Sequence, residues 1–365
     1  MEKQKIKFLN QHGEDFLTAV RRKVDLYFKQ TGKSRSATWE HHVKVVLMFV
    51  GWIALYTTIL DQTFSPPILL VLAMVLGMLT GILGINISHD AAHGSYSSYP
   101  KLNKVLGYTY DLIGLSSYIW RITHNGGHHT FTNIAGHDPD IDKPFLLRLT
   151  PQSPRLWFHS YQNWYIWLLY SFVSINWIYI SDYVYFFKEI RRAPLHEAVL
   201  FFFFKAVNAL VFVVIPLVYM TLPWWQIVIG YVALQMVGGF TVALIFQLAH
   251  IVENVGFPEP DHEGLVHSQW GVHEVLTTSN FGTHNTFLTY ALGGLNFQVE
   301  HHLFPHIAHS HYKEISPLVR ETAYEFNLPY NENKSMSAAI ASHCRLLKKL
   351  GEGVPQNCPS KAEGI

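Results

Sequence analysis

Cysteine and charged residues are both scarce in this sequence. Only Cys344 and Cys358 are cysteines, and they form neither a disulfide framework nor a CxxC pair. This fits a reducing compartment around the C-terminal region. Charged residues make up 15% of the chain, against roughly 25% in an ordinary soluble domain. The sequence therefore predicts that part of the chain lies in lipid.

Basic blocks and a secretory signal are also missing. The formal net charge is +1, and Lys and Arg form no long run. Nothing electrostatic favours nucleic acid as a partner, and we expect none. The N-terminal residues lack the apolar core of a signal peptide, so we expect internal segments to direct membrane insertion.

Long apolar runs are the first positive feature. A membrane-spanning helix needs about 20 mainly apolar residues, and windows 43–60, 67–88, 199–220 and 224–249 approach or exceed that length. Short gaps join them into two hairpins, and neither turn contains Lys or Arg. By the positive-inside rule, both termini and the middle section are expected in the cytoplasm.

We therefore predict an all-α integral membrane protein with four spans and a cytoplasmic helical cap. We expect a cytoplasmic amphipathic segment at 1–42 and a first membrane hairpin at 43–88. A cytoplasmic middle section should follow at 89–198, then a second hairpin at 199–249 and a cytoplasmic C-terminal section at 250–365.

Two further stretches need an interpretation. Residues 164–187 are apolar enough for a fifth span. A single crossing there would, however, place the residues before it and the residues after it on opposite sides of the membrane. We read this stretch, rich in Trp and Tyr, as an interfacial helix. Apolar residues between Phe16 and Phe28 have helical spacing and predict an amphipathic helix. Lys205 lies inside the third span and is expected to extend toward the membrane surface.

Three histidine clusters follow or flank these apolar runs. They read HDAAH at 89–93, HNGGHH at 124–129 and QVEHH at 298–302. The first two contain histidines four residues apart, which share a face on a helix. One such pair alone is more often a surface or core feature. Imidazole suits iron, copper, nickel and zinc, and seven clustered histidines exceed the needs of one ion, so we predict a site for two metal ions.

Further residues could complete such a site. His250 ends the fourth span and is expected to be an eighth ligand, the alternative being an interfacial polar residue. His273, His284 and Asn280 could hold a water or a ligand in place. Acidic residues that could orient the imidazoles by accepting their second N–H are Asp90, Asp138, Asp140, Asp142, Glu253 and Glu300, although an exposed turn is the simpler reading of Asp142.

The ordered boxes, the third followed by LFPH, resemble those of the membrane fatty-acid desaturases. A third box that opens with glutamine, here Gln298, resembles that of the front-end and acyl-CoA desaturase-like branch. Many other relatives carry histidine at this position. A water held by Asn280 or Gln247 would complete the metal shell. The resemblance implies two iron ions, whose ligands would be His89, His93, His124, His128, His129, His250, His301 and His302.

The same resemblance implies an activity. An enzyme of this family uses dioxygen and two electrons to insert a double bond into a long-chain acyl group, carried by CoA or by a lipid. Some relatives contain a fused cytochrome b5 domain with an HPGG motif, which this sequence lacks. We therefore expect a separate donor, of the ferredoxin or cytochrome b5 type, on the cytoplasmic side.

Two other functions compete with this prediction. A hydroxylase with the same histidine boxes, acting on alkanes, sterols or carotenoids, would share the hydrogen-abstraction step. A metal transporter would instead place its histidines near the middle of the bilayer, whereas these histidines lie at span ends and beyond.

Overall fold

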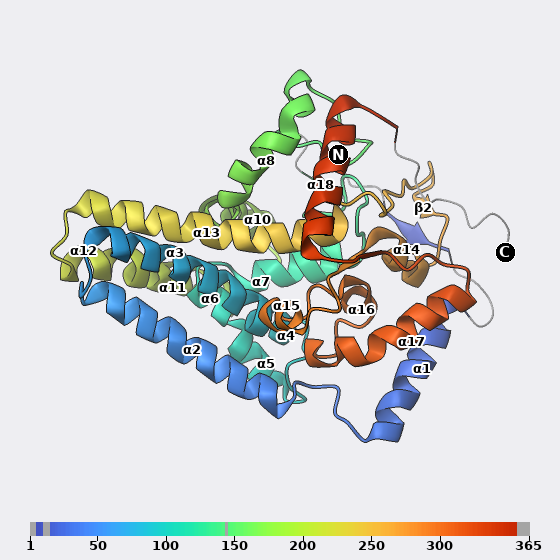
Figure 1. Cartoon of the computed structure of the whole chain (residues 1–365), viewed down its shortest axis with the longest axis horizontal. Helices are drawn as coiled ribbons and strands as arrows, with labels where there is room; N and C mark the ends of the chain where they lie inside the picture. Colours follow the sequence, from blue (N-terminus) through green and yellow to red (C-terminus); the bar gives the residue numbers. More distant parts are fainter. Residues whose placement is uncertain (1–4, 10–14, 143–144, 356–365) are drawn as a thin grey trace. The chain divides into compact units, whose positions relative to one another are not determined.

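The computed structural model describes residues 5–9, 15–142 and 145–355 (Figure 1). Cys358 lies outside the described residues. The chain divides into two compact units. The first, which we call the span unit, contains Ser36–Ile122 and Trp167–Leu244. The second, the box unit, contains Met1–Arg35, Thr123–Ile166 and Ile245–Ile365, and therefore the second and third histidine boxes.

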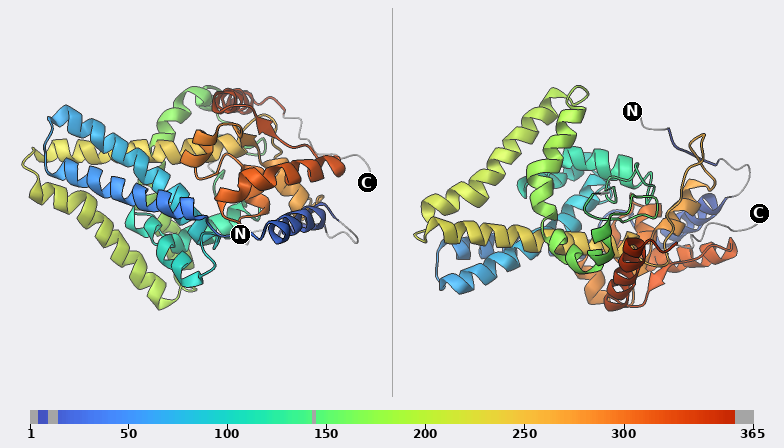
Figure 2. Two further views of the ribbon diagram at one scale, coloured as in Figure 1. Left: turned by 60° about the horizontal axis from the view of Figure 1, so that its bottom comes forward. Right: turned by 90° about the horizontal axis from the view of Figure 1, so that it is seen from above.

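Long apolar helices dominate the span unit. Among the described residues, four helices are long and apolar enough to cross a membrane: Trp39–Leu60, Pro66–Ala92, Leu195–Tyr219 and Trp224–His250. Their ends lie within four residues of those of the expected windows, and the predicted all-α fold with four candidate spans is confirmed. The first two helices lie side by side as a hairpin (Figures 1 and 2).

Two of these helices are interrupted by π-helical turns. The first of them comprises α3 (Pro66–Leu83), η1 (Gly84–Ser88) and α4 (His89–Ala92), and the other comprises α11 (Leu195–Ala209), η5 (Leu210–Val214) and α12 (Ile215–Tyr219). The remaining two are α2 (Trp39–Leu60) and α13 (Trp224–His250), the last turn of which enters the box unit. Proline at the first turn of α3 suits a helix start, where its missing N–H has no intrahelical partner.

Shorter helices complete the span unit. They are α5 (Pro100–Gly107), α6 (Thr109–Leu112), α7 (Ser117–Trp120), α8 (Gln162–Ser171, which begins in the box unit), α9 (Val173–Asn176), η4 (Trp177–Ser181) and α10 (Asp182–Glu189). The apolar stretch 164–187 is thus broken near Phe172 and is not among the four candidate spans. Its interfacial placement stays a prediction.

Glycine allows α3 and α13 to approach each other closely. A Cβ atom added to Gly77 would lie 2.0 Å from the carbonyl oxygen of Leu234. A Cβ on Gly238 would lie 3.0 Å from the carbonyl oxygen of Gly77. Small residues at such crossings bring the backbones of membrane helices into van der Waals contact. The two hairpins are therefore in close backbone contact where α3 crosses α13.

We expect Gly77→Ala to lower the thermal unfolding temperature of the detergent-solubilised protein by several degrees, because the new methyl group requires α3 and α13 to separate. Gly51→Ala is the matched control, since a Cβ on this α2 glycine meets nothing within 4 Å. Alanine favours a helix by about 0.5–1 kcal/mol over glycine, so the control should not be destabilised. Equal unfolding temperatures for both variants would contradict the close crossing.

Lys205 forms an internal polar cluster instead of extending to the membrane surface. Its Nζ donates hydrogen bonds to Asp182 Oδ2 at 2.7 Å, Gly114 O at 2.7 Å and Ile178 O at 2.9 Å. The expectation for this lysine was wrong, because three acceptors match the three N–H donors of the ammonium group. Pairing with a carboxylate offsets part of the cost of burying its charge.

Asp111 lies buried near this cluster, and its carboxylate is poorly compensated. Burial raises the pKa of the Asp111 carboxyl to about 7, although the Ser117 N–H donates to it at 3.2 Å. In the unfolded chain an aspartate titrates near about 3.9. The folded protein therefore binds this proton more tightly, and stability falls as the pH rises from about 4 to 7.

We expect Asp111→Asn to raise the unfolding temperature at pH 8, because the amide keeps an acceptor for Ser117 without a buried charge. The difference from wild type should shrink steadily between pH 7 and pH 4, where the wild-type carboxyl takes up its proton. Thermal unfolding of both proteins across this range measures it, with the exposed Asp61→Asn as control. A gain that does not depend on pH would contradict this account.

The box unit is built from short helices, several of which share an apolar core. Its helices are α1 (Phe16–Thr31), η3 (Trp157–Tyr161), α14 (Trp270–Thr277), α15 (Thr286–Ala291), α16 (Gln298–Leu303), η6 (His309–His311), α17 (Tyr312–Glu325) and α18 (Met336–Glu352). Two parallel pairs of short strands join distant segments: β1 (Lys7–Phe8) with β2 (Leu265–Val266), and β3 (Asn280–Phe281) with β4 (Glu332–Asn333).

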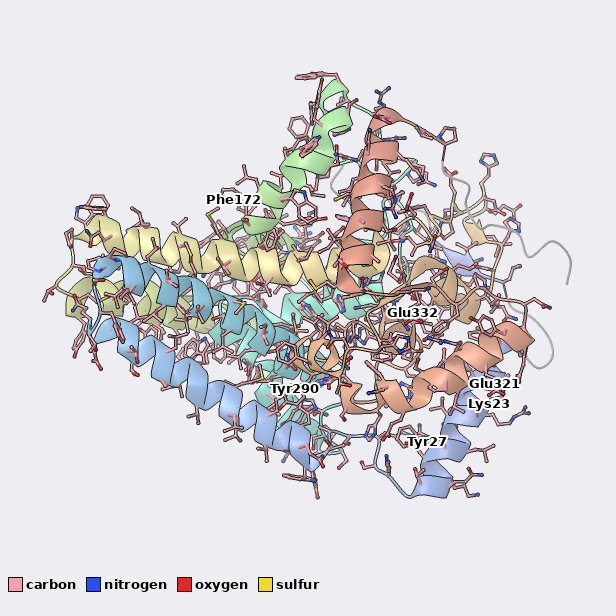
Figure 3. The ribbon with its side chains drawn as sticks, in the orientation of Figure 1. Lys23, Tyr27, Phe172, Tyr290, Glu321 and Glu332 are labelled. Carbon is pink, nitrogen blue, oxygen red and sulfur yellow. The ribbon has the colours of Figure 1, made fainter. Side chains whose placement is uncertain are left out.

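Helix α1 covers the segment that was expected to be an amphipathic helix. Its apolar side chains, among them Val20 and Phe28, join the core of the box unit. Lys23 and Tyr27 project from α1 beside α17 (Figure 3), where they bond to Glu325 at 2.7 Å and Glu314 at 2.6 Å. The apolar face of α1 is therefore covered by protein.

Candidate metal centre

The second histidine box forms a π-helical turn, η2 (Arg121–His128). The N–H of His129 donates to the carbonyl of His124 at 2.9 Å, a bond that spans five residues. As a result the rings of His124 and His128 stack with centroids 5.0 Å apart, and the His124 and His129 centroids are 4.8 Å apart. The four-residue spacing predicts an α-helical turn here, and the structure has a π-helical turn instead. Turns of this π type occur frequently at functional sites.

The third box occupies α16, and its N-terminal end is fixed by Asn280 on β3. The Val299 N–H donates to Asn280 Oδ1 at 2.9 Å, and Asn280 Nδ2 donates to Glu300 Oε2 at 2.8 Å. Tyr330 donates to the other oxygen of Glu300 at 2.6 Å. All these groups are buried or nearly so. His301 and His302 are therefore presented on a short, firmly held helix.

Asn133 joins the second box to the end of α13. This buried residue has a positive φ of 59°, and its Nδ2 donates to the carbonyl of His250 at 2.9 Å and that of Gly256 at 3.2 Å. Asparagine is among the residues that tolerate the left-handed region. The His250 ring is thereby held beside the second box.

Five histidines of the box unit form two overlapping groups. One ligand nitrogen from each of His128, His250 and His302 lies within 4.8 Å of the others, and their ring centroids are 4.6, 4.8 and 5.0 Å apart. His129, His301 and His302 form the second group by the same criterion. All five rings are at most 6% exposed. Imidazoles this close could hold a metal ion between them.

Carboxylates hold two of these rings in one orientation. His128 Nδ1 donates to Asp138 at 3.0 and 3.1 Å, and His302 Nδ1 donates to Glu274 Oε2 at 2.7 Å. Asp138 is itself held by the N–H groups of Asn133 and Asp140, both at 2.9 Å. This is the arrangement by which proteins fix the tautomer of a metal-binding histidine.

The opposite ring nitrogens are available for a ligand. The Nε2 atoms of His128 and His302 are buried and have no hydrogen-bond partner within the described part of the chain. Since buried polar atoms are normally satisfied, two such atoms facing the same cluster suit an electrophile such as a metal ion. The residues therefore fit a metal ion.

Electrostatics in the cluster limit how many rings can be protonated. Burial opposes the charged form of His128, but the adjacent Asp138 carboxylate outweighs it and raises the pKa of this ring to about 9. Burial and the neighbouring imidazoles lower the pKa of His302 well below its usual range. Burial raises the pKa of Glu274 well above its usual range. Neutral imidazole is the form that binds metal, so His302 is in the required state near neutral pH. His128 would release its Nε2 proton when a metal binds.

The first box lies in the span unit, directly after the π-turn η1. The His89 and His93 ring centroids are 4.7 Å apart, and both rings contact Trp120, at 5.4 and 5.3 Å. In η1, Asn86 Oδ1 accepts a hydrogen bond from Lys44 Nζ at 2.6 Å. Asp90 is buried beside these groups, and its charge acts on Lys44. The two histidines thus share one face of the helix, as their spacing indicated.

Other residues proposed from the sequence lie in different surroundings. Gln298 is fully buried, donates to Leu295 O at 2.9 Å, and lies next to His250. Its Oε1 and that of Gln247 are buried without a protein partner among the described residues. Glu300 contacts Asn280 and Tyr330 rather than an imidazole.

The remaining candidates vary in their distance from the cluster. Asp140 Oδ2 lies 3.5 Å from His124 Nδ1. Glu253 pairs with Arg345 and Lys349, and Asp142 is exposed. His273 is buried against Phe8, with ring centroids 5.0 Å apart, whereas His284 is exposed.

Two contacts of the site were missed in the sequence. Glu274 bonds to His302, and the hydroxyl of Tyr312 lies 3.1 Å from His301 Nδ1. Glu274 lies outside the three boxes, in the segment WGVHEVLT. Its one signal is a carboxylate on a mainly apolar helix, where a buried charge requires a partner.

The histidine clusters are buried, and carboxylates hold two of their rings. Together with the four candidate spans, they define a membrane protein suited to a histidine-ligated metal. Residues 65–334 match the fatty acid desaturase family. The chain is 34% identical over 360 residues to the acyl-lipid (8-3)-desaturase of Physcomitrium patens, covering 96% of this chain and 74% of the relative. It is also 34% identical to the sn-1 linoleoyl-lipid 6-desaturase of Arthrospira platensis, covering 92% of each.

A third relative, the sn-1 linoleoyl-lipid 6-desaturase of Synechocystis, is 34% identical over 357 residues, covering 96% of this chain and 98% of the relative. The chain therefore belongs to the fatty acid desaturase family. It is a membrane fatty-acid desaturase, an oxygen-dependent oxidoreductase acting on acyl chains.

Proposed function

We propose that this desaturase uses two iron ions held by the three histidine boxes and His250. The observation that supports this most is the pair of buried Nε2 atoms on His128 and His302. The Nδ1 atoms of the same two rings are held by Asp138 and Glu274. Imidazole with carboxylate support is a ligand type that iron accepts.

The box unit accounts for most of the proposed ligands. His128, His250 and His302 would hold one ion, and His129 and His301, with His124 next to His129, would hold the other. His302 belongs to both groups of rings, so its single available Nε2 would go to one of the ions. His89 and His93 complete the proposed set, and this assignment depends on the sequence resemblance alone.

The protein groups have a limited but definite task. When bound, the iron ions supply the redox chemistry by which dioxygen removes hydrogen. Two adjacent methylenes lose one hydrogen atom each, two electrons and two protons enter, and dioxygen leaves as two waters. Asp138 and Glu274 hold the imidazoles in position, and the burial of the five rings excludes bulk water from the cluster.

Gln298 is proposed to complete the coordination where many relatives have histidine. Its buried Oε1 could hold a water or contribute an oxygen, and Gln247 on α13 is the other candidate for holding that water. Asn280 is less suited, because its side chain already bonds to Val299, Glu300 and Tyr330.

The substrate is proposed to be an acyl chain on a membrane glycerolipid, desaturated near its carboxyl end. This follows the names of the relatives, which are one acyl-lipid (8-3)-desaturase and two sn-1 linoleoyl-lipid 6-desaturases. We further propose that the site faces the cytoplasm, by the distribution of Lys and Arg. There it would receive electrons from a separate ferredoxin or cytochrome b5 type donor.

Expression in a host that lacks polyunsaturated fatty acids tests this function. Linoleate would be supplied, and lipids would be separated by class before their fatty acids are profiled by mass spectrometry. We expect a new double bond near the carboxyl end, first in glycerolipids. Hydroxylated products without new double bonds would favour the hydroxylase, and products that appear first in acyl-CoA would contradict the lipid carrier.

A further inference from the structure

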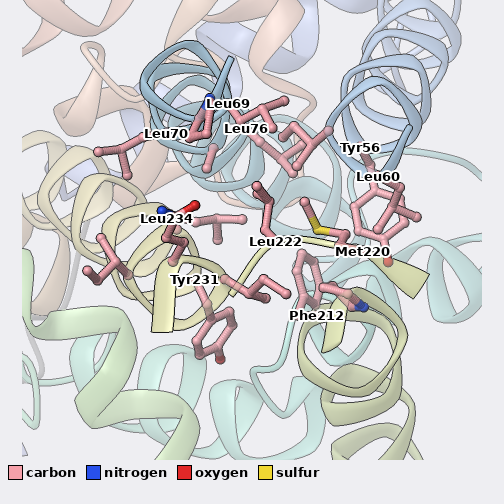
Figure 4. A pocket seen from close by; sticks show the side chains of 18 of the residues that line it. Tyr56, Leu60, Leu69, Leu70, Leu76, Phe212, Met220, Leu222, Tyr231 and Leu234 are labelled. Atoms are coloured by element: carbon pink, nitrogen blue, oxygen red, sulfur yellow. The ribbon is translucent and has the colours of Figure 1, made fainter. Parts of the chain in front are cut away.

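A cavity of about 320 Å³ lies within the span unit, between its two helical hairpins. Its walls come from α2, α3, the π-turn η5 with α12, and the first part of α13, and they are almost entirely apolar (Figure 4). At roughly 30 Å³ per water-sized group, it has room for about ten methylenes. This is enough for a large part of one acyl tail.

The cavity is bounded at both ends along the helices. At the turn end, Gln62 Oε1 accepts hydrogen bonds from the N–H and the hydroxyl of Thr221, both at 3.0 Å, which ties the two hairpin turns together. At the inner end, Leu76 and Leu234 form the wall (Figure 4). Immediately beyond them α3 and α13 touch at Gly77.

The cavity communicates with the outer surface of the helices. Ile229, more than one turn into α13, lines it and is 49% exposed. In a membrane this surface faces hydrocarbon, so acyl chains are the molecules in contact with the opening. An apolar cavity open to hydrocarbon is filled by lipid at little cost.

The cavity lies far from the first histidine box along the helix that carries both. His89 lies twelve residues after Gly77, about 18 Å along a helix with a rise of 1.5 Å per residue. An extended chain advances about 1.2 Å per bond, so about fifteen bonds would be needed to reach the inner wall from His89. That length spans a whole leaflet, which is about 15 Å thick. The cavity therefore belongs to the leaflet remote from the first box.

A polar group lies at the outer part of this cavity. Gln226, the third residue of α13, lines it, and its Oε1 is buried without a protein partner among the described residues. Trp224 and Trp225 precede it, at the position where tryptophan anchors a span at headgroup depth. A lipid headgroup with an O–H donor would satisfy this oxygen.

We propose that the cavity is a second lipid site, distinct from the catalytic one. It binds a phospholipid of the leaflet at the turn ends, with one acyl tail between the hairpins and a hydroxyl-bearing headgroup, such as that of phosphatidylglycerol, at Gln226. The bound lipid fills the space between the hairpins. The site does not depend on the metal centre.

Native mass spectrometry with dioleoylphosphatidylglycerol as the probe tests this site. Gly230→Phe should fill the cavity, because Gly230 lines it and a Cβ there meets nothing within 4 Å. Gly51→Phe is the matched control, an equally open glycine on α2 that lies outside the cavity. We expect wild type and the control to retain one lipid, and Gly230→Phe to retain at least tenfold less.

Gln226→Leu provides a second test that leaves the cavity open. It should abolish the preference for dioleoylphosphatidylglycerol over dioleoylphosphatidylcholine, which wild type should show. Equal lipid retention by Gly230→Phe and wild type would overturn the proposal. So would a change in the acyl chain length accepted for desaturation by Gly230→Phe, which would assign the cavity to the substrate. Lipid retention by a protein without desaturase activity would instead count against the proposed function alone.

Discussion

Replacing His302 with alanine is expected to abolish desaturation and to reduce bound iron to well under half of the wild-type amount. His302 is the one ring shared by both groups of imidazoles in the box unit. Its centroid lies 4.3 Å from that of His129 and 4.8 Å from that of His250. Removing it takes a proposed ligand from the cluster and leaves Glu274 buried without its imidazole partner.

Membrane insertion should survive this change, because the four candidate spans do not include His302. The measurements are iron content of the purified protein, fatty-acid products in the host, and the amount of protein in the membrane fraction. His267→Ala is the control, since this exposed histidine pairs with Asp261. Wild-type turnover by His302→Ala would remove His302 from the ligand set, whereas loss from the membrane would show a structural role.

The features that could be predicted from the sequence depend on local patterns. Apolar windows of span length correspond to helices in the structure, because burial in lipid requires continuous apolar residues and internal hydrogen bonds. The four-residue spacing of His89 and His93 places them on one face, since α4 continues the preceding helix. Both conclusions need only the geometry of one helix.

The parts that could not be predicted depend on contacts between distant segments. Glu274 meets His302 across 28 residues, and Lys205 finds its three acceptors in two other segments. The π-turn of the second box changes the relative orientation of His124 and His129, which α-helical periodicity could not indicate. Spacing shows which residues can share a face, but it does not show which buried groups satisfy each other.

Glu274→Gln is expected to weaken iron binding 10- to 100-fold, the usual effect of losing a carboxylate behind a ligating imidazole. Glutamine has nearly the same shape, but it presents a neutral oxygen to His302 Nδ1, and its amide can also turn its NH₂ toward the ring. The His302 ring then becomes a weaker donor to metal and is less firmly oriented. Desaturation should fall with the loss of iron.

Stability separates this positioning role from a structural one. Because burial raises the pKa of Glu274 well above its usual range, the folded protein disfavours the charged carboxylate. A neutral amide removes that cost, so the metal-free variant should unfold at a temperature equal to or above that of metal-free wild type. Glu321→Gln, on the exposed face of α17 (Figure 3), is the control and should change neither property.

Three measurements on the purified Glu274→Gln protein therefore belong together: iron affinity by competition with a chelator, desaturase activity with excess iron, and unfolding temperature without metal. We expect weaker affinity, activity partly restored by excess iron, and undiminished stability. Wild-type affinity would show that the 2.7 Å contact between His302 and Glu274 does not support the metal. A large fall in the unfolding temperature would show instead that Glu274 holds α14 against α16, because the packing of these two helices would then depend on that bond.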